Sequence, residues 1–275
     1  MDELRRMQPG LGTFVEVGAR SKGANAAIEA AFVAIERAQT LWSFQNPHSE
    51  LSLLNGAPTG SQVPVHADTL RLLKIATLLM RASGQTFDCT IGGMLVDQAI
   101  LPDHGGPAPL PRGQADDIEL GHGWARLHRP LRLTLDGLAK GYAVDLAIRA
   151  MKREGAMAGW VNAGGDLRVF GDMALPVRRR ELDGRYVSLG MLREAAMASS
   201  KADDEQAPLD ADFPGRIVAP AGQAPQPGMW TVLARSAWRA DALTKVAATT
   251  PPSQREALVS RLGGHLITPT MDIAA

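Results

Sequence analysis

The sequence predicts an α+β fold with largely antiparallel strand pairing, and two observations carry this prediction. Strand-like segments follow one another in runs, and amphipathic helical segments stand between those runs. This order is typical of α+β proteins, whose neighbouring strands are joined by short turns. No repeat of fixed short period is visible, and the 275 residues fit either one large domain or two modest ones.

The N-terminal part of the chain predicts one strand followed by helices. Residues 12–20 alternate in polarity and carry β-branched side chains, which is typical of a strand. Residues 23–43 place apolar side chains three and four positions apart, which predicts an amphipathic helix. A short helix or turn is expected over 49–55, with Ser49 as its N-cap.

The next helix is expected over 66–88, with Asp68 as its cap and Gly84 as its stop. Residues 101–115 are dense in proline and glycine, which predicts a loop. The remaining strands are expected over 124–130, 131–137, 158–165, 166–171, 186–190, 195–200, 215–220 and 229–236.

Three further helices complete the expected fold. The first begins near Lys140 and runs for about four turns, with one apolar face that comprises Ala143, Leu146, Ala147, Ala150 and Met151. The other two begin near Arg239 and at Ser253. The polar segment 201–214 shows no periodicity and is expected to be a loop.

Composition excludes several classes of protein. Lysine plus arginine and aspartate plus glutamate both number 29, so the formal net charge is zero, which gives no support to nucleic-acid binding. The basic run 178–180 is interpreted as a solvated strand end or turn. No segment reaches about 18 uninterrupted apolar residues, so no membrane span is expected.

The single cysteine and the N-terminal segment say little about function. Cys89 has no partner for a disulfide within the chain, and we interpret it as a small buried apolar residue. The N-terminal segment contains no apolar core that precedes a cleavage site. As written, the chain is expected to be cytoplasmic, or periplasmic if a leader has been removed.

Two glycine-containing corners flank the helix that begins near Lys140. The first contains Gly137 and Gly141, which let the backbone approach a ligand without a Cβ in the way. A helix N-terminus there presents unpaired N–H groups that suit a phosphate, and Lys140 adds a positive charge. A simple turn before a helix is the alternative interpretation of this corner.

The second corner follows a predicted strand. It consists of Asn162, Ala163, Gly164, Gly165 and Asp166. A hairpin turn or a bulge is an alternative explanation of this corner alone. Two such corners on either side of one helix favour a ligand site over two unrelated turns.

Six segments that lie in order over residues 11–245 carry a resemblance to a known family. They read LGTFVEV, SELSLLN, GQTFDCTIGG, LDGLAKGYAVD, VNAGGDLRVFG and ADALTK. The chain resembles the ApbE-type FAD:protein FMN transferases, once described as thiamine-biosynthesis lipoproteins. The resemblance implies one domain over residues 1–275, with an α+β, T-fold-like architecture of two related halves. It also implies FAD as substrate and Mg²⁺ as cofactor. The implied reaction transfers FMN to a threonine or serine of an acceptor flavoprotein that carries an Asp-Gly-x-Thr motif.

The resemblance assigns roles to residues of this chain. It implies that Mg²⁺ is held by the Gly137 carbonyl, by Asp241 and by Thr244. The remaining implied contacts are with FAD, and they comprise Trp42, Thr86, Phe87, Asp88, Thr134, Lys140, Asn162, Gly164, Gly165, Asp166 and Ile217. We expect Asp241, Asp136 and Arg216 to act in catalysis, with Lys140 and Arg216 as phosphate ligands.

Several positions depart from the family pattern. Thr134 stands at the usual ligand-contacting aspartate of DLGGIAKG, and an acid appears two places later as Asp136. Arg216 replaces a histidine and so removes a candidate proton acceptor. Lys245 replaces the metal-side threonine, where its ammonium group either fills the cation position or points outward. Trp42 stands where many members have a methionine, and an indole can still stack on a flavin ring.

Two functions remain open on these residues. The first is Mg²⁺-dependent transfer of FMN from FAD, and the second is a flavin-binding or flavoprotein-assembly role without transfer. A dinucleotide oxidoreductase is not supported, because no G-x-G-x-x-G follows a strand and the six histidines show no metal-type spacing. Self-modification is not expected either, since LDGLAK and LDGRYV both lack the acceptor threonine.

Overall fold

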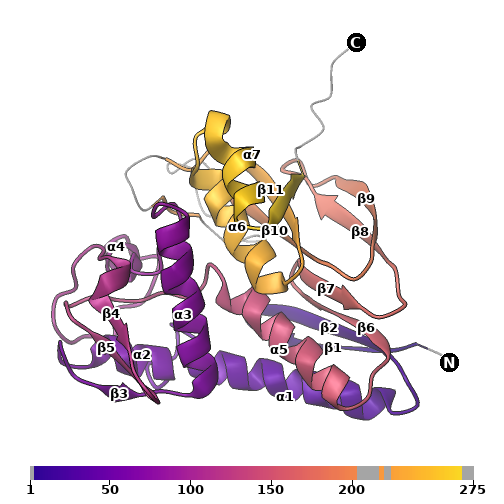
Figure 1. The fold of residues 1–275 in the computed structure, drawn as a ribbon, viewed down its shortest axis with the longest axis horizontal. Coiled ribbons are helices and arrows are strands. Elements are labelled where there is room, and N and C mark those ends of the chain that lie inside the picture. Colours follow the sequence, from indigo (N-terminus) through magenta and orange to yellow (C-terminus); the bar gives the residue numbers. More distant parts are fainter. Residues whose placement is uncertain (1–2, 203–216, 220–223, 268–275) are drawn as a thin grey trace.

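The computed structural model describes residues 3–202, 217–219 and 224–267, which contain an antiparallel sheet of seven strands (Figure 1). The sheet order is β1-β2-β6-β7-β10-β11-β12, and every neighbouring pair is antiparallel. The strands are β1 (Leu4–Gly10), β2 (Thr13–Arg20), β6 (Ala158–Ala163), β7 (Asp166–Phe170), β10 (Ala196–Ala202), β11 (Gly228–Ala234) and β12 (Gly264–Ile267).

Three helices cover one face of this sheet and enclose the main core (Figure 1). They are α1 (Ala24–Trp42), α5 (Ala139–Arg153) and α6 (Ala237–Thr249). Val15 and Val17 of β2 and Val161 of β6 point into this core. A smaller core on the opposite face is closed by the hairpin of β8 (Leu175–Arg180) and β9 (Tyr186–Leu192). Alternation along each strand thus supplies both cores.

A second group of elements lies beside the C-terminal end of α1 (Figure 1). It contains a three-stranded sheet in the order β3-β5-β4, which is antiparallel throughout. Its elements are α2 (Glu50–Gly56), β3 (Val63–Pro64), α3 (Ala67–Ala82), α4 (Gly92–Asp97), the 3-10 turn Ala115–Asp117, β4 (Ile118–Leu120) and β5 (Trp124–Leu127). The last helix, α7 (Pro252–Arg261), packs on α6. The predicted α+β class with antiparallel sheets is confirmed.

The helix starts and stops follow local chemistry. The Ser49 side chain caps α2 by accepting from the N–H of Ser52, as predicted. The predicted cap of α3 was wrong, because the His66 ring accepts from the N–H of Asp68 and His66 is therefore the N-cap. α3 also ends at Ala82 rather than at 88. Gly84 adopts φ +64° just beyond the end of α3, which only a residue without a Cβ adopts readily.

The predicted strand 131–137 is absent, although its apolar side chains alternate. Leu131, Leu133 and Leu135 are all buried. The Leu133 backbone pairs with the side-chain amide of Asn55, which donates to its carbonyl at 2.8 Å and accepts from its N–H at 2.7 Å. A single amide therefore satisfies the groups that a neighbouring strand would otherwise satisfy.

Five strands of the described residues were not predicted, namely β1, β3, β4, β8 and β12. β1 and β12 are the two edges of the large sheet, and most β1 side chains are exposed, so neither strand carries a clear buried alternation. Within β8 the basic run is not fully solvated, since the Arg179 side chain is 2% exposed and pairs with Glu181 at 2.7 Å. The interpretation of 178–180 as a solvated segment was therefore wrong for Arg179.

Other predictions have mixed outcomes. Cys89 is buried, as expected. Of the predicted strand 215–220 only residues 217–219 are described, and they are not in a strand. Among the described residues, no helix is both long and apolar enough to cross a bilayer.

Candidate functional site: the junction of two helix N-termini

The N-termini of α5 and α6 meet at van der Waals distance, and Gly141 makes the contact possible. A Cβ at Gly141 would lie 2.4 Å from the carbonyl oxygen of Ala237. Backbone carbonyls do not yield as flexible side chains do, so any larger residue would force the two helices apart. Gly141 was predicted to let the backbone approach a ligand, whereas in the structure the close neighbour at Gly141 is the backbone of α6.

Each helix supplies a carboxylate that caps the other. Asp145 of α5 accepts from the N–H groups of Ala237 and Trp238 of α6, both at 3.0 Å. Asp241 of α6 accepts from the N–H of Gly141 in α5, also at 3.0 Å, through Oδ2. Neither helix has a side-chain cap from its own N-cap residue. The two buried carboxylates thus satisfy N–H groups that would otherwise lack partners, and they complement both helix dipoles.

The second oxygen of Asp241 is engaged by a lysine of its own helix. Lys245 Nζ forms an ion pair with Asp241 Oδ1, and it donates to Ser200 Oγ of β10 at 3.1 Å. Thr244 Oγ1 donates to the Asp241 carbonyl at 2.7 Å and also lies 2.7 Å from Ser200 Oγ. Ser200 was not identified from the sequence, because a serine in a strand gives no signal until its neighbours are known.

The two glycine corners come together through an ion pair. Lys140 Nζ of the first corner lies 3.1 Å from Asp166 Oδ2, at the end of the second. Burial and the nearby charge of Asp241 together raise the pKa of Asp166 to about 6, against the opposing effect of the ammonium groups of Lys140 and Lys245. The carboxylate of Asp166 in turn raises the pKa of Lys140. The charges of this cluster are therefore mutually dependent.

Asp136 is the exposed member of the cluster. The surrounding protein raises its pKa through desolvation, but water reaches the side chain directly and screens that effect. Its backbone N–H faces the hydroxyl of buried Thr134 at 3.4 Å. Asp136 is thus placed where it can exchange a proton with a ligand or with solvent.

The second corner is built as a tight turn between β6 and β7. Gly164 and Gly165 have φ values of +60° and +102°, and the Asn162 side chain accepts from the N–H of Gly165 at 2.9 Å. A Cβ at Gly164 would lie 2.7 Å from the Thr13 hydroxyl oxygen. The turn therefore requires glycine for its own geometry. Asp166 follows the turn directly and lies next to Lys140.

Residues 86–88 approach the first corner only in part. The Phe87 ring lies beside Gly137, where a Cβ would be 3.1 Å from Cε2. The Thr86 carbonyl accepts from the Thr249 hydroxyl of α6 at 3.0 Å. Asp88 turns toward its own loop and accepts from the N–H and hydroxyl of Thr90. The structure thus brings Phe87 to the junction and gives Asp88 a role in its loop.

Of three other predicted residues, two are buried and one lies outside the described part. The Trp42 indole is buried and donates to the Thr69 hydroxyl at 2.9 Å, with its ring 5.7 Å from that of Tyr142. Ile217 is buried. Arg216 lies outside the described residues. Their roles in FAD binding or catalysis remain predictions.

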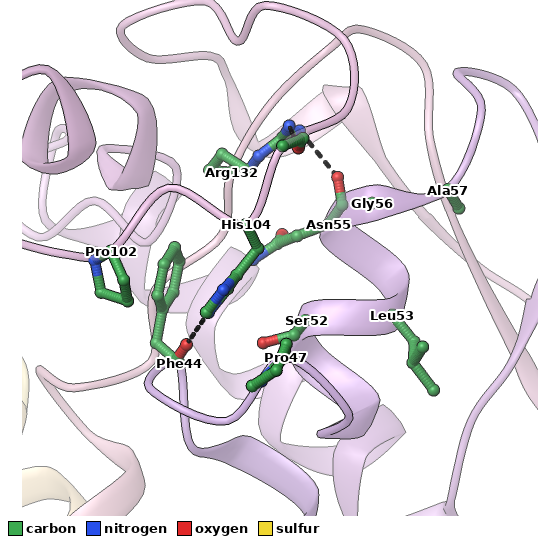
Figure 2. Close-up of a pocket in the computed structure, with 11 residues that line it drawn as sticks. Phe44, Pro47, Ser52, Leu53, Asn55, Gly56, Ala57, Pro102, His104 and Arg132 are labelled. Atoms are coloured by element: carbon green, nitrogen blue, oxygen red, sulfur yellow. Dashed lines mark hydrogen bonds between the residues drawn. The ribbon is translucent and has the colours of Figure 1, made fainter.

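A separate pocket of about 260 Å³ lies by α2, and none of the predicted residues lines it (Figure 2). The His104 ring stacks on Phe44, and Nε2 lies 2.7 Å from the Phe44 carbonyl oxygen. The Arg132 guanidinium donates to the carbonyls of Asn55 at 2.7 Å and of Gly105 at 2.8 Å. Arg132 therefore ties the loop of His104 to the end of α2, and it was not singled out from the sequence.

The residues implied for Mg²⁺ do not fit a divalent ion in this arrangement. Both carboxylate oxygens of Asp241 are engaged, one by Gly141 and the other by Lys245. The Thr244 hydroxyl is engaged by Asp241 and Ser200. Within the described ranges, no group of three or more His, Cys, Asp or Glu side chains is arranged to hold a metal. The ammonium group of Lys245 would also repel a divalent ion, which needs oxygen ligands around it.

Comparisons with known proteins agree with this architecture. Flavin transferase ApbE from Vibrio cholerae superposes with a TM-score of 0.78 at 18% identity, over 98% of this chain and 97% of that chain. The apo form of the Pseudomonas stutzeri flavinyl transferase ApbE gives 0.79 at 18%, over 98% and 95%. The ApbE protein from Thermotoga maritima gives 0.80 at 22%, over 96% and 93%.

These structural similarities concern the fold, while a family model addresses the sequence. A search of curated proteins gives no match. The model of the ApbE family matches residues 11–267, which is nearly the whole chain. The chain belongs to the ApbE family.

Proposed function

We propose that this protein transfers FMN from FAD to a threonine or serine hydroxyl of an acceptor protein. The observation that carries the proposal is the meeting of Lys140 and Lys245 in one partly exposed cluster. Two ammonium groups that lie close together suit the negative charge of a pyrophosphate. Membership of the ApbE family supports FAD as the pyrophosphate compound.

The proposed reaction is a displacement at phosphorus. The acceptor hydroxyl oxygen forms a bond to the phosphorus of the FMN half, and the bond from that phosphorus to the bridging oxygen breaks. AMP leaves with that oxygen, and the hydroxyl proton passes to a base. Such a transfer depends on positioned phosphates and on neutralised charge more than on covalent chemistry.

Residues of this chain have distinct parts in the proposal. Lys140 and Lys245 bind phosphate oxygens, and Arg216 is a predicted further phosphate ligand. Asp136 takes the hydroxyl proton, since it is the exposed carboxylate at the first corner. Asp241 is a positioning residue, because its carboxylate holds Lys245 and the backbone of Gly141.

Intact-mass measurement tests this function. The protein is incubated with FAD and a target that carries the Asp-Gly-x-Thr motif, and the target is expected to gain one FMN. Asp136→Asn should slow the transfer by about 10²–10⁴. Asp97→Asn, at another exposed aspartate, serves as the matched control. Transfer that is indifferent to Asp136→Asn would assign the proton to another acceptor.

A second candidate function is FAD binding without transfer, for example in flavoprotein assembly. The engaged oxygens of Asp241 and the threonine at position 134 favour it. A fluorescence titration distinguishes the two functions, since a binding protein would quench FAD fluorescence and leave the target mass unchanged. Absence of both signals would contradict both functions.

A further inference from the structure

The environment of Lys245 resembles that of a bound cation. Its ammonium group is held by the Asp241 carboxylate of the same helix and by the Ser200 hydroxyl of β10. Its aliphatic part runs past the first corner, where a Cβ at Gly137 would be 4.0 Å from Lys245 Cγ. The lysine therefore lies among the same residues that the family resemblance assigns to Mg²⁺, namely Gly137, Asp241 and the hydroxyl of Thr244.

The formal charge of the cluster supports this reading. Three carboxylates, Asp136, Asp166 and Asp241, face two ammonium groups, Lys140 and Lys245, which mutually shift the pKa values of the cluster. When all five side chains are ionised, the cluster has a net charge of −1. Without Lys245 it would sum to two negative charges, which is the balance that a divalent ion neutralises.

The ammonium group also retains access to a ligand. The Lys245 side chain is 23% exposed, whereas Asp241 is fully buried behind it. An ammonium group has three N–H donors, and two of them are directed at Asp241 and Ser200. Within the described residues the third donor has no hydrogen-bond partner, so it can meet an anionic oxygen on the exposed side.

We propose that Lys245 is a tethered cation that occupies the place of the divalent metal and makes phosphate binding at this junction metal-independent. Whether Lys245 excludes the metal can be tested in the absence of FAD or any other phosphate compound. Only the identity of the phosphate compound rests on the proposed function.

The test uses Mn²⁺ as a paramagnetic probe and follows its binding by electron paramagnetic resonance. Wild type is expected to show no binding that depends on Asp241, which Asp241→Asn checks. Lys245→Met removes the charge and keeps the length, while Lys245→Thr also supplies an oxygen. Both variants are expected to bind one Mn²⁺ at least about 100-fold more tightly than wild type. Lys74→Met, on the exposed side of α3, is the matched control and should behave as wild type.

Thermal melts provide a second readout if the variants are unstable. Mg²⁺ should raise the Tm of Lys245→Thr and leave that of wild type unchanged, because a metal would then neutralise Asp241. Stoichiometric Mn²⁺ binding by wild type that is lost in Asp241→Asn would overturn the proposal, whatever the variants do. Failure of both folded Lys245 variants to bind Mn²⁺ would also overturn it. Neither result bears on whether FAD binds, so failure here and failure of the proposed function are separable.

Discussion

Asp145 and Asp241 hold the α5–α6 junction from opposite sides, yet their surroundings differ. Asp145 gives both oxygens to N–H groups of α6 and pairs with Arg168 of β7. Asp241 gives one oxygen to Gly141 and the other to Lys245, next to further charged side chains. Both carboxylates therefore cap a helix, but Asp145 is part of a purely structural contact, whereas Asp241 belongs to a charged and partly exposed cluster.

The difference shows how a helix-capping carboxylate can also contribute to a ligand-binding site. At Asp145 every acceptor is used by the fold, so removal of the carboxylate should change stability alone. At Asp241 the carboxylate positions a lysine that retains exposure. Removal of that lysine should change ligand binding more than stability.

The largest expected effect is the loss of the Asp145 contact. Asp145→Ala leaves two N–H groups of α6 and the Arg168 guanidinium without their partner, which should lower the free energy of unfolding by about 3–5 kcal/mol. Chemical denaturation measures this loss. A loss of less than about 1 kcal/mol would mean that the junction does not depend on this cap.

A smaller effect is expected from the close approach of the two helices. Gly141→Ala places a methyl group against the Ala237 carbonyl and should cost about 1–3 kcal/mol, because the helices must separate. Gly56→Ala is the control, since nothing lies within 4 Å of a Cβ there. Equal melting temperatures of the two variants would show that α5 and α6 can separate at Gly141 with little loss of stability.

The smallest expected effect is a dependence of stability on pH at the charged end of the junction. The pKa of Asp166 is raised to about 6 in the fold, so the folded state holds this proton more tightly than the unfolded chain. The contribution is therefore greatest below the ordinary pKa of 3.8 and declines as the pH rises toward about 6. Asp166→Asn should lack this decline, as urea titrations at several pH values can show. A pH profile that matches that of wild type would remove Asp166 from the charged cluster.

Much of the fold could be predicted because its signals are local. The periodicity of 23–43 and the alternation of 12–20 depend on neighbouring residues, and both elements are present. The segment 131–137 shows the limit of such signals, because its alternation reflects burial while its backbone pairs with the side chain of Asn55, far away in sequence. Edge strands such as β1 have one partner and an exposed face, so their sequences are weakly constrained.

The site shows the same division between local and distant information. The sequence motifs predicted Lys140, Asp166 and Asp241 as site residues, and the structure places all three in one cluster. Asp145 was missed as a functional cap, because its partners lie 92 and 93 residues further along the chain. The direction of Lys245 was left open by the sequence and depends on Ser200, which belongs to another element.

The most direct test of the account compares the two cations that pair with the two carboxylates. FAD fluorescence is titrated in the presence of EDTA with wild type, Lys245→Met and Arg168→Met. We predict that wild type binds FAD without metal, that Arg168→Met stays within about twofold of it, and that Lys245→Met binds at least about tenfold more weakly. Equal affinities of the two variants, or binding by wild type only after Mg²⁺ is added, would contradict the account.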